Sequence, residues 1–170
     1  AAGAAVTDTR SGRSIVSGIT LPTHLFQPVA TVTSAGVTVL AQPITSIWGP
    51  VQDLFFGCGD PNRPGHLYWT LPGNLDAWPS VNAVEVCSPS EELMAGCVYA
   101  GQPFVFSRLR LFSCFPNLSA PGQVAAIPTA CTRGLVARWS FDVGYGGIFF
   151  ISQDGIYVTQ GGPEQNITDA

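Results

Sequence analysis

Apolar and polar residues alternate with a period of two along much of the chain, in segments that are short and bounded by glycine or proline. Residues 28–33 alternate in this way, Ser34-Ala35-Gly36 interrupts the pattern, and residues 37–40 resume it. Because successive side chains of a strand point to opposite faces, this pattern predicts a β-hairpin. Residues 135–143 place Leu135, Ala137, Trp139, Phe141 and Val143 against Arg138, Ser140 and Asp142, which predicts a strand with one packed face.

Three further segments predict strands joined by tight turns. Asp154-Gly155 separates the apolar residues 147–152 from residues 156–159. This dipeptide is a strong hairpin signal because the turn needs positive φ angles. Residues 54–56 lead through a turn at 59–65 to residues 66–69, and residues 97–112 predict a meander of three strands.

The strand–turn–strand units recur about every 40–50 residues, which is the period of a four-stranded β-propeller blade. Closed propellers have about 4–8 blades, and 170 residues supply three or four. The chain is therefore expected to be all-β, as blades of an incomplete ring or as an open sheet or sandwich. With 19 glycines and 14 prolines, helices have little room, and residues 90–96 are the best helical candidate.

We expect two regions: an extended N-terminal arm over residues 1–27 and a single β domain over residues 28–170. Residues 115–130, with three prolines, predict a long exposed loop. The Ala/Gly-rich opening lacks the basic-then-apolar order of a signal peptide, which favours a processed chain or an excerpt of a longer one.

Charge is scarce in this sequence. Charged residues make up 11%, against roughly 25% in soluble domains, while 46% of residues are hydrophobic. Either a partner covers the surface or uncharged polar residues supply it. The seven positive charges are all arginines, they are dispersed, and the net charge is −4, which argues against nucleic acid as a partner. No apolar run approaches the ~18 residues of a membrane span.

The five cysteines are an odd number without a CxxC pair, so we expect free thiols that behave as small apolar residues. A single bridge, Cys87–Cys97 or Cys114–Cys131, is the alternative. Free thiols suit a reducing compartment.

No catalytic, cofactor-binding or metal-binding residue is predicted, and we do not expect an enzyme. His24 and His66 lack zinc-ligand company, and neither a GxSxG elbow, a phosphate loop nor a DxDxDG calcium loop is present. The acidic residues considered as glycosidase pairs or turn caps are Asp53, Asp60, Asp76, Glu85, Glu91, Glu92 and Asp154. Turn capping is the preferred interpretation for Asp60, Asp76 and Asp154, which lie within two residues of Gly, Pro or Asn.

Aromatic residues could form a sugar-binding or base-binding platform, although on alternating strands they are more often core. The candidates are Trp48, Trp69, Trp78, Trp139, Tyr68, Tyr99, Tyr145 and Tyr157. Residues 117–119 and 166–168 match the N-glycosylation pattern, a short motif that arises often by chance.

Residues 50–170 carry a recurring set of phrases. These are LYWT at 67–70, LDAWP at 75–79, NAVEV at 82–86, SPSE at 88–91, FVFS at 104–107, GLVARWS at 134–140 and FFISQDGIY at 149–157. The set resembles β-rich, propeller-like virion proteins from the head-to-tail or tail region of tailed bacteriophages. The first 50 residues carry no such likeness.

The resemblance implies a virion building block without a reaction or cofactor. Its partners would be other virion proteins and copies of itself, in a particle assembled in the bacterial host cytoplasm. The loops at 57–66, 71–92 and 115–132 would form the interaction surface. The alternative from the residues alone is a secreted or surface carbohydrate-binding β module that uses exposed tryptophans. A hydrolase with carboxylates in a cleft is a distant third.

Overall fold

The computed structural model describes residues 31–34, 37–40, 44–75, 78–79, 82–117 and 123–168, with residues 31–40 described by their backbone alone. All fourteen regular elements in these ranges are β-strands, so the expected all-β class is confirmed. The predicted arm over residues 1–27, with His24, lies outside the described residues.

Two strands form a separate hairpin, and twelve form three antiparallel four-stranded sheets. The hairpin is β1 (Thr31–Ser34) with β2 (Val37–Leu40), which confirms the turn predicted between them. The first sheet is β3 (Ser46–Val51), β4 (Leu54–Cys58), β5 (His66–Trp69) and β6 (Ala83–Glu85). The second is β7 (Leu93–Tyr99), β8 (Gln102–Ser107), β9 (Leu111–Pro116) and β10 (Val124–Pro128). The third is β11 (Phe141–Gly144), β12 (Gly147–Ser152), β13 (Gly155–Thr159) and β14 (Gln165–Asn166).

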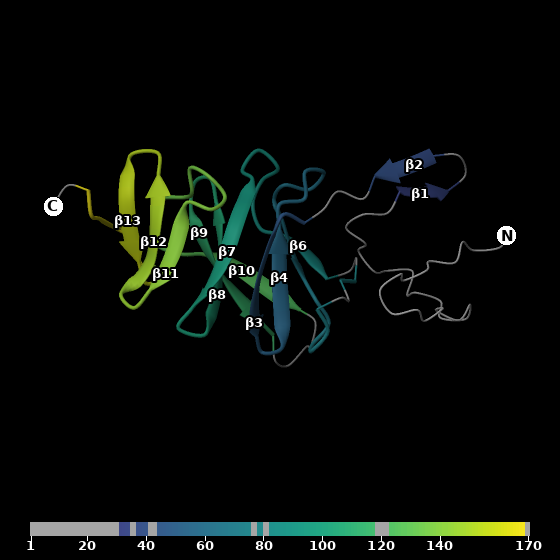
Figure 1. The fold of residues 1–170 in the computed structure, drawn as a ribbon, viewed down its shortest axis with the longest axis horizontal. Helices are drawn as coiled ribbons and strands as arrows, with labels where there is room; N and C mark the ends of the chain where they lie inside the picture. Colours follow the sequence, from purple (N-terminus) through teal and green to yellow (C-terminus); the bar gives the residue numbers. More distant parts are fainter. Residues whose placement is uncertain are drawn as a thin grey trace, which may run out of the picture.

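Each sheet is a meander in chain order, which is the topology of a propeller blade. The first strands begin at Ser46, Leu93 and Phe141, 47 and 48 residues apart, in agreement with the predicted period. Figure 1 shows the three sheets following one another along the long axis of the molecule. Strand β7 contacts β3 and β4 on one side and β11 on the other, so the first strands of the sheets approach one another.

Three local predictions are wrong. Residues 90–96 hold no helix: β7 begins at Leu93, because both faces of this segment are covered by other sheets. Residues 135–143 are not one strand, since β11 covers only Phe141–Gly144. The predicted loop at 115–130 contains β10, which pairs with β9 from Val124 opposite Pro116 to Pro128 opposite Phe112.

The second sheet buries both of its faces. Strands β7, β8 and β9 each carry a continuous run of buried residues instead of an alternating pattern. Leu93, Val105 and Phe112 pack toward the first sheet, in a cluster with Trp48 and Phe56. The opposite face packs against Ile148, Phe150 and Tyr157 of the third sheet, through Ala95, Phe104, Phe106 and Leu111. Continuous apolar runs are expected where a sheet is covered on both sides.

The two outer sheets differ in how they cover their outward faces. On the first sheet, Trp78 is buried over Gly57, whose Cα faces the indole and the side chain of Ile44. On the third sheet, β12 alternates: Ile148 and Phe150 are buried, whereas Phe149 and Ile151 are exposed. The third sheet therefore has the one-sided burial of a sheet that ends a stack.

Gly96 sets how closely β7 approaches the first sheet. A Cβ atom at this position would overlap the indole ring of Trp48, which stacks on Phe56 with 6.1 Å between ring centroids. The contact therefore requires glycine because of the space, and no side chain fits without moving Trp48.

We expect Gly96→Ala to lower the free energy of unfolding by about 1–3 kcal/mol through overpacking, measured by urea denaturation. Gly162→Ala, where an added Cβ meets nothing within 4 Å, is the matched control and should change it by less than about 0.5 kcal/mol. In a double-mutant cycle, Trp48→Leu should recover part of the Gly96→Ala loss. Strictly additive losses would show that the two residues do not clash.

Candidate functional site

A polar cluster joins the three sheets where their first strands begin. Arg138, in the segment before β11, donates from Nη2 to Glu92, which directly precedes β7. It also donates from Nη1 to Thr45 Oγ1 at 2.5 Å, and Thr45 directly precedes β3. Arg108 Nη2 approaches the second Glu92 oxygen at 3.2 Å. One guanidinium therefore connects the first strands of all three sheets.

Glu92 is held ionised by this cluster. Partial burial raises the pKa of its carboxyl, but hydrogen bonds and charge attraction from Arg138 and then Arg108 outweigh burial, and the net pKa is lowered. A lowered carboxyl pKa means that ionised Glu92 stabilises the fold above the pKa of the unfolded chain. The contribution is lost as the pH falls through the folded-state pKa.

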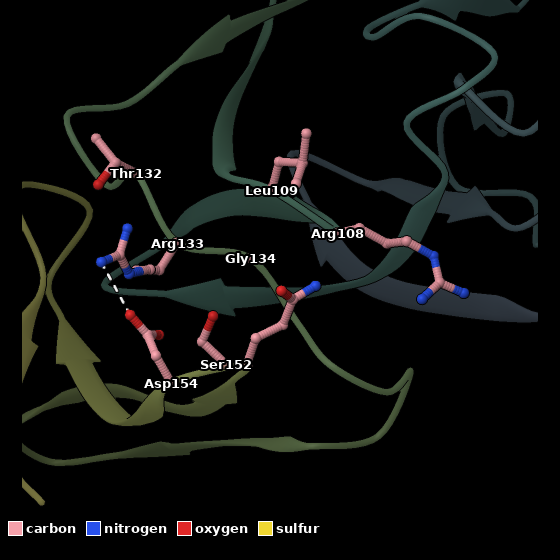
Figure 2. Close-up of a pocket in the computed structure, with 8 residues that line it drawn as sticks. Arg108, Leu109, Thr132, Arg133, Gly134, Ser152 and Asp154 are labelled. Carbon is pink, nitrogen blue, oxygen red and sulfur yellow. Dashed lines mark ion pairs between the residues drawn. The ribbon is translucent and has the colours of Figure 1, made fainter.

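A polar hollow of about 240 Å³ lies between the loops of the second and third sheets. The turn after β8 provides Arg108 and Leu109, residues 132–134 form another wall, and residues 152–154 close it. Figure 2 shows Arg133 pointing toward Asp154, with 2.9 Å between Nη2 and Oδ2, whereas the head group of Arg108 is turned away from both. The Arg133 guanidinium carbon also lies 5.9 Å from the centre of the Tyr157 ring.

Each guanidinium at this hollow already has a carboxylate partner. Arg133 pairs with Asp154, Arg108 shares Glu92 with Arg138, and outside the hollow Arg110 lies 3.6 Å from Glu91. An anionic ligand would have to displace a carboxylate at each guanidinium. The hollow therefore has the properties of a structural junction between two sheets.

The carboxylates considered as catalytic pairs are scattered. Asp60 is buried, accepts the Tyr68 hydroxyl at 2.7 Å and caps the turn through Asn62 N–H at 2.9 Å. Burial, followed by the hydrogen bond and charge of Asp60, raises the pKa of Tyr68. Asp53 lies exposed in the β3–β4 turn and Glu85 exposed on β6. Asp76 lies outside the described residues. The preferred turn-capping role of Asp60 is thus present.

Within the described ranges, histidine and cysteine side chains form no catalytic or metal-binding site either. His66 begins β5 and stacks beside Tyr68, with 6.3 Å between ring centroids. All five cysteines are free and buried, and desolvation raises the pKa of each thiol, which makes them poor nucleophiles. Among the described residues there is no group of three His, Cys, Asp or Glu side chains that could hold a metal ion. The part of the chain that the structure describes also lacks a helix long and apolar enough to span a membrane.

The aromatic candidates divide into core and surface. Trp48, Trp69, Trp78, Tyr68 and Tyr157 are buried, and Tyr99 is partly buried. Trp139 is exposed over 69% of its surface, and Tyr145 is also exposed, in the turn between β11 and β12. Sequence reasoning placed Trp139 on a packed strand face, and the structure places it on the surface.

Trp139 belongs to an apolar surface that we call the third-sheet face, which consists of Trp139, Phe149, Ile151 and Ile156. With Asp142 and neighbouring residues they line an open hollow of about 290 Å³. Ile151 pairs with Ile156 across β12 and β13, and Asp142 lies opposite Phe149 at the edge strand β11. Clustered exposed apolar side chains on a soluble domain mark an interaction surface. The sequence signal was present in FFIS, where both strand faces are apolar, but the outward face could not be assigned.

We expect Arg138→Met to lower the free energy of unfolding at pH 7 by about 1–2 kcal/mol, because it removes charged hydrogen bonds at a partly buried site. In urea denaturation, the difference from the wild type should shrink as the pH falls through the lowered pKa of Glu92 in the folded wild type, where its carboxylate becomes protonated. Arg63→Met, at an exposed turn, is the control and should have little effect at any pH. A difference that stays constant over the whole acidic range would contradict the role of ionised Glu92.

Comparison with known proteins assigns no family: the sequence matches no protein-family model and no curated protein sequence. The structural features of this chain that bear on its function are the third-sheet face and the cluster around Arg138.

Proposed function

We propose that this chain is a non-enzymatic structural protein that acts through protein–protein contacts, as a building block of the tail or head–tail junction of a tailed-phage virion. It would be assembled in the bacterial host cytoplasm, with other virion proteins and copies of itself as partners. Its function is then to present a rigid β surface to neighbours in the particle.

The observation that carries the proposal is the third-sheet face. Three of its four apolar side chains, Phe149, Ile151 and Ile156, lie on paired strands, so this part of the face is rigid before any partner arrives. Trp139 lies in the turn that precedes β11. Rigid surfaces lose little conformational entropy on association, which favours a permanent contact. The loops at 57–66, 71–92 and 115–132 remain predicted as additional contact regions.

Two further observations support a structural role. Four of the five arginines in the described ranges are paired with carboxylates, at or near the junctions between sheets. Burial of all five thiols, free in the structure, suits a protein that assembles under reducing conditions. The phrases of residues 50–170 that resemble tail and head-to-tail proteins support the tail or head–tail junction as the proposed location.

We expect the chain to co-purify at fixed stoichiometry with gradient-purified particles of the phage that encodes it, and antibodies against it to label the tail or neck in electron micrographs. A particle carrying Ile47→Glu, on an exposed position of β3 outside the predicted contact regions, should incorporate the chain normally. Ile156→Glu, on the third-sheet face, should reduce incorporation at least tenfold. Particles that contain none of the wild-type chain would exclude the proposal.

A carbohydrate-binding module is the second candidate, and the exposed indole of Trp139 above an apolar hollow favours it specifically. Sugar rings stack on exposed aromatic faces of this kind. Trp48, Trp69 and Trp78 are buried, so Trp139 is the tryptophan that a glycan could reach in the described residues.

If the chain is a carbohydrate-binding module, at least one glycan of a panel should change its tryptophan fluorescence. Trp139→Ala should abolish the change, whereas Tyr99→Phe should leave it intact. The structural proposal predicts no response to any glycan. A saturable response that depends on Trp139 would therefore replace the first proposal with the second.

A further inference from the structure

We propose that the third-sheet face binds the same face of a second copy of this chain, forming a twofold-symmetric dimer. The inference rests on the proposed function only in taking this face as an interaction surface, and it names the occupant. Four observations carry it: a positional correspondence between two sheets, the charge of the face, the coverage of the first sheet and the area available.

The second and third sheets match residue for residue in their second strands. Both β8 and β12 have six residues and end in serine, at Ser107 and Ser152. This alignment places Phe149 at the position of Phe104, and Ile151 at the position of Phe106. Phe104 and Phe106 are 5% and 0% exposed because they pack against the third sheet, whereas Phe149 and Ile151 are 37% and 45% exposed.

The third strands continue the correspondence. Phe106 pairs with Leu111 across β8 and β9, just as Ile151 pairs with Ile156 across β12 and β13. Leu111 is fully buried against the third sheet, and its counterpart Ile156 is 39% exposed. At these three positions the third sheet therefore repeats the apolar surface that the second sheet packs against its neighbour. The face is therefore shaped to pack against another β-sheet.

The charge on this face suits a copy of itself. Its four residues are uncharged, and Asp142 is the ionisable group that borders the hollow. Asp142 lies on β11, the edge strand of the sheet, and its carboxylate is satisfied by the Val143 N–H at 2.8 Å. Two such faces can meet around Ile151 and Ile156 with each carboxylate at the rim. A strongly charged partner would find no complementary group at the centre.

The first sheet offers a second copy a different surface. In the described part of the chain, its outward face carries Trp78, buried over Gly57, and Ile47, which lies opposite Gly57 and is 51% exposed. A head-to-tail arrangement, third sheet on first sheet, would have to accommodate the Trp78 indole over Gly57. Face-to-face pairing of two third sheets needs no rearrangement, and a contact that uses one patch on both copies closes as a twofold dimer.

The exposed area is sufficient for such a dimer. Trp139 is 69% exposed and the other three residues about two-fifths, which amounts to roughly 400 Å² of apolar surface per copy when an aromatic side chain spans about 150–250 Å². With its polar rim, a face-to-face pair would bury on the order of 1,000 Å² in total, the threshold for a biological interface and within the range of weak, transient ones. We therefore expect a weak dimer, which has to be tested at high protein concentration.

Sedimentation equilibrium of the full chain tests the proposal. The wild type should sediment as a dimer at 50 µM, and Ile156→Glu should weaken the dimer at least tenfold. Ile47→Glu is the matched control, since Ile47 is 51% exposed on β3 of the first sheet, and it should leave the dimer intact. A monomeric wild type, a larger assembly, or equal loss in both variants would overturn the dimer. A monomer that still enters virions would leave the proposed function standing.

Cross-linking provides a test that survives any folding defect of the glutamate variant. Ile151→Cys should give a covalent dimer with a short bismaleimide, whereas Ile47→Cys, at an equally exposed strand position, should give at least tenfold less. The five native thiols are buried with raised pKa values, so they should react slowly. Equal cross-linking of the two variants would show random collisions and contradict the specific face.

Discussion

Burial of the second sheet on both faces is the constraint on which the rest of this structure depends. Strands β7, β8 and β9 are apolar on both sides, so neither neighbouring sheet can leave without exposing Leu93 and Val105 or Phe104 and Phe106 to water. The first and third sheets are consequently fixed relative to the second. Gly96, by admitting the Trp48 ring, brings β7 close to the first sheet. The order of layers therefore follows from the pattern of the middle one.

A stack of sheets always has two ends, and this chain ends its stack in two different ways. The first sheet covers its outward face with a segment of its own, through Trp78 over Gly57. The third sheet leaves Phe149, Ile151 and Ile156 uncovered. The difference lies in the connections: Trp78, between β5 and β6, lies over its sheet, whereas the β11–β12 and β12–β13 turns have two residues each. Association through the third sheet is thus the consequence of a repeated unit without a covering segment.

The sequence predicted features set by neighbouring residues and missed those set by distant ones. The Asp154-Gly155 hairpin follows from turn chemistry alone, and β12 and β13 pair around it as expected. Residues 135–140 alternate like a strand, yet Leu135 N–H bonds to Ser107 O, and Gly134 fits against the backbone of Arg108, where a Cβ would collide. Those contacts are made with the end of β8 and the turn after it, which are distant in the sequence, so no local pattern encodes them. The third-sheet face escaped prediction for a related reason: FVF in β8 and FFI in β12 are equivalent in type, and only the packing shows which one is covered.

The polar cluster and the apolar face are connected through one short turn. Arg138 is anchored to Glu92 and Thr45, and Trp139 is the next residue. The turn is closed by a hydrogen bond from Ser140 N–H to Ala137 O at 3.2 Å. Two further backbone bonds tie it to Ile151 of β12: Val136 N–H donates to Ile151 O, and Ile151 N–H donates to Ser140 O. The backbone of Trp139 is therefore held beside β12, although 69% of the residue is exposed. Because this backbone is already ordered, a partner has less conformational entropy to remove there, and the ion pair that joins the sheets also prepares the surface for a partner.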